Sequence, residues 1–293
     1  MVKLKKKKKL PEWIHSLVDF NDQNYLYIKK IFSILGIETI CSAGLCPNRY
    51  FCWSKKEFSF LICGRECTRN CFYCNIKKRN KLKNIDFNEA ERLAFVINKF
   101  NLDYVVLTSV SNDDLTDGGF KHFINCIKKI KMYNKTKIEV LIPDFKNKNI
   151  EINELIDSGV DVIGHNIELP KRLFQKLRPA ADYDYSLQFL STIRKNRKRQ
   201  LIKSGIIIGL GETKTEVKET IEDIAETGCE VLTIGQYLSP TQKHYPVIDF
   251  IHPDIFEEYR QYALKYGFKA VLSAPLVRSS FNSKGVYFNI YGN

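Results

Sequence analysis

Three cysteines lie close together in the run Cys67-Thr-Arg-Asn-Cys71-Phe-Tyr-Cys74, a C-x3-C-x2-C spacing. Thiolates are soft ligands that suit zinc or iron–sulfur clusters. A [4Fe–4S] cluster takes one ligand for each of its four irons, so three thiolates leave one iron with an open position. An open iron can bind and react with a small molecule, whereas a fully ligated cluster usually carries electrons or stabilises the fold. The spacing therefore predicts a reaction centre.

Another three cysteines come earlier in the chain, so we name them the first triplet and Cys67, Cys71 and Cys74 the second triplet. Cys41, Cys46 and Cys52 are spaced C-x4-C-x5-C, and they too lack a fourth thiol. Structural zinc prefers four ligands, commonly as two C-x2-C pairs, and neither triplet supplies such pairs. A redox-active pair at Cys71 and Cys74 would leave Cys67 unexplained. Zinc and redox chemistry remain alternatives, but two incomplete iron–sulfur sites explain the pattern best.

Composition limits the setting of this chemistry. The chain has 293 residues, a formal net charge of +13 and nine cysteines, seven of them between Cys41 and Cys74. No apolar run reaches the ~20 residues of a membrane span, and no secretory signal peptide is recognisable. Clustered cysteines without an export signal favour metal over disulfides, so we expect a reducing cytoplasm. The positive charge predicts an acidic partner, either nucleic acid or an acidic carrier protein.

Beyond the cysteines, strand-like and helix-like runs alternate. The expected strands are 58–63, 104–109, 137–142, 160–165, 202–209 and 231–236. The expected helices are 24–35, ahead of the alternation, and then 88–101, 119–132, 152–158, 186–196 and 214–227. The last of these helices carries a regular apolar stripe, with Thr213 or Lys214 to open it and Gly228 to close it.

Six β-α units predict an α/β fold with a parallel sheet and right-handed crossovers. Six units are too few for a complete eight-unit barrel, so we expect a partial (β/α)6 TIM-like barrel with N- and C-terminal extensions. Residues 1–56 would form the N-terminal extension with the first cysteine triplet, 57–270 the barrel, and 271–293 the C-terminal extension. The second triplet follows the first expected strand, so it would lie at the mouth of the barrel, where catalytic groups gather.

The C-x3-C-x2-C run after a strand resembles the signature of the radical S-adenosylmethionine superfamily. Together with the first triplet, it closely resembles the lipoyl synthase family. Further segments resemble that family over most of the chain: 105–119, 139–145, 165–168, 209–213, 233–237 and 277–281. The family usually has tyrosine and then histidine where this chain has Phe281 and Asn282.

The resemblance implies two [4Fe–4S] clusters with different tasks. Cys67, Cys71 and Cys74 would bind the cluster that cleaves S-adenosylmethionine to methionine and a 5′-deoxyadenosyl radical. Cys41, Cys46, Cys52 and Ser280 would bind an auxiliary cluster that supplies sulfur. The activity implied is insertion of two sulfur atoms at C6 and C8 of an octanoyl chain on a carrier-protein lysine, with two S-adenosylmethionine molecules cleaved. A serine ligand is harder than a thiolate and should leave a soft iron site more readily.

S-adenosylmethionine also needs contacts for its carboxylate, amine, ribose and adenine. Candidate contacts are Tyr73, Thr108, Ser109, Asn166, Glu168 and Arg178. Each also has an ordinary structural interpretation, as packing, a helix-entry turn, a polar cluster or a salt bridge. We expect His165 to be structural, and Cys63, Cys126 and Cys229 to be small buried side chains.

The resemblance further implies partners. These are octanoylated lipoyl domains of 2-oxoacid dehydrogenase E2 subunits, the glycine-cleavage H protein, a ferredoxin or flavodoxin reductant, and an iron–sulfur carrier that rebuilds the auxiliary cluster. We expect a monomer without nucleic-acid or membrane partners. Two other functions remain open: a different radical enzyme with an auxiliary cluster, such as a tRNA methylthiotransferase, or a zinc-containing nucleic-acid-binding module.

Overall fold

The computed structural model describes residues 9–14, 23–79, 85–133 and 135–292. Residues 1–8 and 15–22 of the expected N-terminal extension lie outside the described residues. Within these ranges, no helix combines the length and apolar character that crossing a membrane requires.

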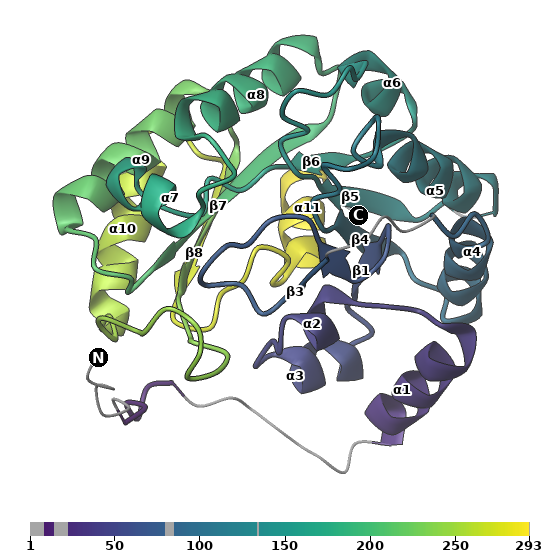
Figure 1. The fold of residues 1–293 in the computed structure, drawn as a ribbon, viewed down its shortest axis with the longest axis horizontal. Coiled ribbons are helices and arrows are strands. Elements are labelled where there is room, and N and C mark those ends of the chain that lie inside the picture. The colour runs from purple at the N-terminus through teal and green to yellow at the C-terminus, as the bar shows by residue number, and fades with distance from the viewer. Residues whose placement is uncertain (1–8, 15–22, 80–84, 134, 293) are drawn as a thin grey trace.

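A curved parallel sheet organises the molecule (Figure 1). Its strands lie in the order β1-β4-β5-β6-β7-β8-β9, and every neighbouring pair is parallel. Their bounds are β1 Ser59–Ile62, β4 Tyr104–Ser109, β5 Lys137–Leu141, β6 Val162–Gly164, β7 Leu201–Ile208, β8 Val231–Gln236 and β9 Ala270–Ala274. Because β9 does not pair with β1 in this order, the barrel is open, and the predicted partial α/β barrel is confirmed.

Helices follow the strands and cover the outer face of the sheet (Figure 1). They are α4 Glu89–Lys99, α5 Phe120–Tyr133, α6 Ile152–Asp157, α7 Lys171–Leu177, α8 Tyr183–Asn196, α9 Lys214–Glu226 and α10 Pro253–Lys265. Helix α9 begins as predicted, because Thr213 and Glu216 form a reciprocal capping box. Strands of a parallel sheet covered on both faces are buried along their length, and in β7 all residues but one are buried.

The sheet is one strand longer than the six strands expected from the sequence. Strand β9 was not predicted because all five of its residues are only half-buried, so it shows neither a buried run nor an alternating pattern. It pairs with β8 over Val231–Gly235. Since β9 begins at Ala270, it straddles the expected boundary between barrel and C-terminal extension.

The two extensions contact the barrel at different places. Helices α1 Gln23–Leu35, α2 Ile40–Ala43 and α3 Arg49–Ser54 lie beside β1, where Figure 1 shows them below the sheet. Helix α11 Ser283–Tyr291 lies on the concave side of the sheet. A small ribbon of β2 Glu66–Cys67 and β3 Lys77–Lys78 brackets the loop that carries the second cysteine triplet.

Candidate active site

The loop after β1 gathers Cys67, Cys71 and Cys74 at the mouth of the barrel. Backbone hydrogen bonds fix it at both ends: Arg79 N–H donates to the Cys67 carbonyl oxygen at 2.7 Å, and Phe72 N–H to the Leu177 carbonyl oxygen at 3.0 Å. Burial raises the pKa of Cys71, and the neighbouring Cys67 raises it further. Burial likewise raises the pKa of Cys74 to about 12, with further contributions from Cys71 and Cys67. The three thiols are therefore electrostatic neighbours, and a bound cluster would hold them as thiolates.

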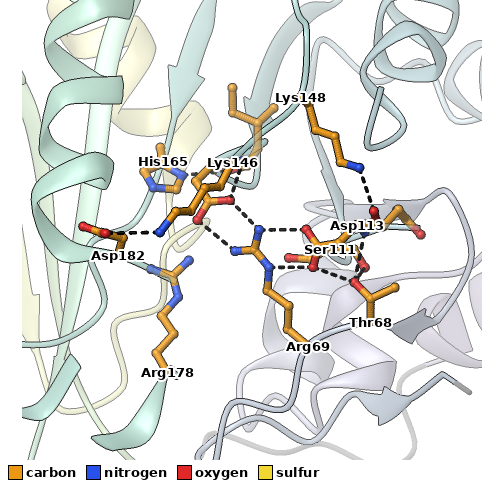
Figure 2. A network of polar contacts seen from close by, with 12 residues as sticks. Thr68, Arg69, Ser111, Asp113, Lys146, Lys148, His165, Arg178 and Asp182 are labelled. Carbon is orange, nitrogen blue, oxygen red and sulfur yellow. Dashed lines mark hydrogen bonds and ion pairs between the residues drawn. The ribbon is translucent and has the colours of Figure 1, made fainter. Parts of the chain in front are cut away.

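Arg69, between the first two cysteines of this triplet, connects the loop to two other strands. Its guanidinium donates two hydrogen bonds of 2.8 Å each to the Asp113 carboxylate, and two of 2.8 and 2.6 Å to the Asp144 carboxylate. Figure 2 shows the Arg69 guanidinium facing Asp113, with Thr68 donating to the same carboxylate. Asp113 follows β4 and Asp144 follows β5. Bidentate contacts of this kind fix direction as well as distance.

A second arginine of the same loop is anchored in the same way. Arg79 donates to Asn112 Oδ1 at 3.0 Å and forms an ion pair with Asp114. Both arginines are buried, with 7% of their surface exposed. The segment after β4 thus holds the cysteine loop at two points. This role was not predicted, because the Ser-Asn-Asp-Asp run after β4 offers carboxylates but no local pattern in the sequence pairs it with Arg69 and Arg79.

Four of the candidate S-adenosylmethionine contacts lie together. Arg178 Nη1–H donates to the Asn166 carbonyl oxygen at 3.2 Å, and Asn166 Nδ2–H donates to Glu168 Oε1 at 3.0 Å. Burial raises the pKa of Glu168, and Arg178 opposes this. Tyr73, Glu168 and Cys71 all interact electrostatically with the Arg178 guanidinium. The cluster therefore presents one cation and one carboxyl group next to the cysteine loop, which fits the carboxylate and amine of an amino acid.

Glu168 has an unusual backbone conformation, with φ at 71°. Its N–H donates to the Gly205 carbonyl oxygen at 2.9 Å, and its carbonyl oxygen accepts from Ile207 N–H at 2.8 Å. A positive φ is costly for a residue with a long side chain, and residues in this conformation are often found at functional sites. These hydrogen bonds to β7 hold Glu168 at the cavity wall.

The side chains of Thr108 and Ser109, the other two candidate contacts, bind to nearby backbone instead of joining this cluster. Thr108 Oγ1–H donates to the Leu141 carbonyl oxygen, and Ser109 Oγ–H donates to the Val110 carbonyl oxygen, each at 2.9 Å. Neither is among the described residues that line the main cavity. Both hydroxyls thus have local backbone partners, and their contact with S-adenosylmethionine stays a prediction.

Cys41, Cys46 and Cys52 come together on α2, α3 and the turn between these helices. Leu45 reverses the chain there with φ at 53°, and Cys46 N–H donates to the Cys41 carbonyl oxygen at 3.0 Å. Burial raises the pKa of Cys52, and both Cys41 and Cys46 raise it further. Burial and the neighbouring Cys46 likewise raise the pKa of Cys41. This triplet, too, forms a group of neighbouring thiols.

The segment with Ser280 folds back against the first triplet. Asn48 Nδ2–H donates to the Leu276 carbonyl oxygen at 2.6 Å, and the rings of Phe51 and Phe281 stack with centroids 6.4 Å apart. Phe281 therefore packs on the residue before Cys52, which gives the substituted position a contact of its own. A turn from Arg278 to Phe281, closed by a 2.8 Å backbone hydrogen bond, carries Ser280.

One cavity of about 430 Å³ connects these features. Its lining includes Cys41, Cys46, Cys52, Ser280, Tyr73, Cys74 and Glu168. Among the described residues, no three His, Cys, Asp or Glu side chains form a ready-made site for a single ion. A cubane has its ligands on four separate irons, so its thiolates surround the cluster rather than converge on one atom. The first triplet and Cys74 of the second triplet line this cavity, while Cys67 and Cys71 do not, and each group of neighbouring thiols fits such a cluster.

The residues expected to be structural are buried as predicted. His165 is 0% exposed, and its ring Nδ1 lies 2.9 Å from the Ile142 carbonyl oxygen. Cys63, Cys126 and Cys229 are 6%, 0% and 5% exposed. Cys63 is strained, with φ at 61°, and packs against Gly119 at the end of β1.

Comparison with known proteins agrees with this site. The family model described as the radical SAM superfamily matches residues 61–224, more than half of the chain. Two solved structures share the fold: methylornithine synthase (PylB), at a TM-score of 0.55 and 13% identity over 73% of this chain and 71% of the other, and Streptococcus suis SuiB bound to S-adenosylmethionine, at 0.58 and 12% over 80% and 58%. The fold and the C-x3-C-x2-C loop define a radical S-adenosylmethionine enzyme.

Sequence similarity over nearly the full length of the chain shows which family of radical S-adenosylmethionine enzymes it belongs to. The chain is 47% identical to the lipoyl synthase of Caldicellulosiruptor saccharolyticus over 93% of this chain and 95% of the other. It is 45% identical to that of Caldicellulosiruptor bescii over 96% and 98%, and 42% identical to that of Alkaliphilus metalliredigens over 94% and 95%. The chain belongs to the lipoyl synthase family.

Proposed function

We propose that this enzyme converts a protein-bound octanoyl-lysine into lipoyl-lysine by inserting sulfur at C6 and C8, and that an auxiliary [4Fe–4S] cluster is the source of the sulfur. One observation carries the proposal: all three cysteines of the first triplet and Cys74 of the second triplet line the same cavity. A substrate arm that enters this cavity would lie between a centre that activates C–H bonds and a centre that holds sulfide.

The two sites have separate residues. Cys67, Cys71 and Cys74 would hold the cluster that binds S-adenosylmethionine, while Cys41, Cys46, Cys52 and Ser280 would hold the auxiliary cluster. When bound at Cys67, Cys71 and Cys74, the cluster together with S-adenosylmethionine supplies a 5′-deoxyadenosyl radical that removes hydrogen from an unactivated carbon.

The chain's own residues position the participants. The Arg178 guanidinium would pair with the methionine carboxylate, and Glu168 would accept a hydrogen bond from the methionine amine. Asn166 would reach the ribose, and the Tyr73 ring would pack on adenine. Because the cationic and acidic groups are fixed by Asn166 and by the β7 backbone, little reorganisation is needed when the ligand binds.

The cavity wall suits a hydrocarbon arm. Its apolar lining includes Ile40, Phe58, Val106, Leu141 and Ile206. Burial of an octanoyl chain against such a wall is favourable at ~0.8 kcal/mol per CH₂ group. Exclusion of water also protects a carbon radical from quenching.

The proposed partners follow from the same assignment. Octanoylated lipoyl domains of 2-oxoacid dehydrogenase E2 subunits and the glycine-cleavage H protein would present the octanoyl-lysine. A ferredoxin or flavodoxin would supply electrons, and an iron–sulfur carrier would rebuild the auxiliary cluster. The net charge of +13 favours acidic carriers, and turnover should therefore fall as salt rises.

The test is anaerobic incubation with S-adenosylmethionine, a reductant and an octanoyl-lysine peptide. We expect 5′-deoxyadenosine and a peptide with two new sulfur atoms. The Ser280→Ala and Cys46→Ala variants should still form 5′-deoxyadenosine but leave the peptide without two sulfurs. Sulfur transfer to tRNA instead of the peptide would contradict the proposal.

A further inference from the structure

The base of the barrel contains a buried ion pair that the proposed chemistry does not use. Lys203 on β7 donates to both carboxylate oxygens of Glu139 on β5, at 2.9 and 3.2 Å. Tyr104 on β4 donates to the same carboxylate at 2.7 Å. Lys203 is 3% exposed and Glu139 is 1% exposed. Barrel interiors are usually filled by branched apolar side chains, so this layer needs an explanation.

Lys203 of this pair also contacts a residue outside the sheet. Lys203 Nζ donates to Ser283 Oγ at 2.6 Å, and Ser283 is the first residue of α11. Helix α11 closes the base: its Tyr287 packs with the opening residues of four strands, which are Tyr104, Val162, Leu201 and Val231. The ion pair therefore holds the start of the C-terminal helix.

Stability alone does not explain this arrangement. Replacing a buried ion pair by apolar residues of similar volume is often neutral or stabilising, because both charges lose their hydration. An apolar layer would close the barrel as firmly, but it would not fix where α11 begins. A directed hydrogen bond from a rigid ammonium does so, because it specifies one atom of one residue.

The fixed residue lies close to Ser280 along the chain. They are three positions apart, a distance of at most ~10 Å even in an extended chain. Ser280 is also held on both sides: Asn166 Nδ2–H donates to Ser279 Oγ at 2.5 Å, and Phe281 stacks on Phe51. Between Phe281 and Ser283 the backbone turns through Asn282, whose φ is 51°. The Ser283 anchor thus limits how far Ser280 can withdraw from the cysteine triplet.

We propose that the Lys203–Glu139 pair is a positioning device that holds Ser283, and through it Ser280, against Cys41, Cys46 and Cys52. The device makes a weak serine ligand dependable until the auxiliary cluster is used, while α11 and the barrel stay in place. This inference rests on the proposed function, because Ser280 matters as a ligand only if the auxiliary cluster exists.

The first test needs no metal. Ser283→Ala removes the anchored hydroxyl and leaves the ion pair intact, and Ser191→Ala, on the exposed face of α8, is the matched control. Hydrogen exchange of backbone amides 276–283 in the metal-free protein should become about tenfold faster in Ser283→Ala, as expected for one lost charge-assisted hydrogen bond. Unchanged exchange in both Ser283→Ala and the double variant Lys203→Met/Glu139→Leu would overturn the proposal.

The second test separates this inference from the proposed function. Wild type should hold ~8 irons per chain, and a chelator should remove four of them at least several-fold faster from Ser283→Ala than from Ser191→Ala. The other four should stay, so 5′-deoxyadenosine formation should persist. Eight irons with equal release rates would overturn the positioning role alone. A wild-type maximum of four irons would overturn the proposed function, and the inference with it.

Discussion

Replacement of Arg69 tests most sharply how the loop of Cys67, Cys71 and Cys74 is held. Its guanidinium is the partner of the fully buried Asp144 carboxylate. Burial alone would raise the pKa of Asp144, but the hydrogen bonds and charge of Arg69 outweigh it and lower this pKa from 3.8 to about 2. That displacement corresponds to about 2.5 kcal/mol of stability at neutral pH.

The sign follows from the depressed pKa. Asp144 contributes its full stability above pH 3.8 and loses it as the pH falls through about 2. Arg69→Leu leaves the buried carboxylate without its partner at neutral pH. We therefore expect a loss of ~3–5 kcal/mol in the free energy of unfolding, of similar size from pH 6 to pH 8.

The assay is urea unfolding of the metal-free protein, followed by circular dichroism. Arg65→Leu is the control, because Arg65 lies in the same loop but its side chain is 66% exposed and its contact with Glu38 is 3.4 Å long. It should cost less than ~1 kcal/mol. A double-mutant cycle of Arg69→Leu with Asp144→Asn should give a coupling of at least ~2 kcal/mol.

The same variant has a functional consequence. Because Arg69 lies between two cysteines of the loop, its loss should release the irons of that site first and leave the auxiliary four in place. Arg69→Leu should then hold ~4 irons per chain and form no 5′-deoxyadenosine. If Arg69→Leu unfolds like Arg65→Leu and the coupling is near zero, the anchoring role is refuted.

Three further predictions concern other residues. Arg178→Leu should weaken S-adenosylmethionine binding at least ~10-fold, as measured by isothermal titration of the reconstituted protein, because it removes a charge-assisted pair; unchanged affinity would assign Arg178 a structural role. His165 has its pKa lowered from 6.5 to about 4 by burial, so stability should be full above pH 6.5 and fall by ~3 kcal/mol on acidification to pH 4; urea unfolding of His165→Gln should show a smaller decline. At Gly235 a Cβ would collide with the Val277 carbonyl oxygen, so Gly235→Ala should displace the Ser280 segment and cut sulfur insertion more than 5′-deoxyadenosine formation; equal losses would count against that path.

Much of the fold could be predicted because its strands are buried on both faces. Strands β4 and β8 have the predicted bounds, and the other predicted strands differ by one or two residues at their ends. Strand β9 escaped prediction because half-buried residues give no period. Helices α2 and α3 are only four and six residues long, and the sequence showed their cysteines rather than any helical stripe.

The candidate site also has a part that the sequence predicts and a part that it does not. The cysteines carry their own signal, because thiols at short spacings have few other uses. The contacts of Arg69 with Asp144 and of Lys203 with Ser283 join residues 75 and 80 positions apart. Such pairs depend on how the strands are ordered in space, and no local pattern in one sequence specifies them.

We propose that this protein draws sulfur from its own auxiliary cluster. The most direct measurement is a single turnover of protein reconstituted with heavy-isotope sulfide, with mass spectrometry of the octanoyl-lysine peptide. We expect two heavy sulfur atoms in the product from wild type and none from Ser280→Ala. A product with two sulfurs of natural isotope composition would contradict it.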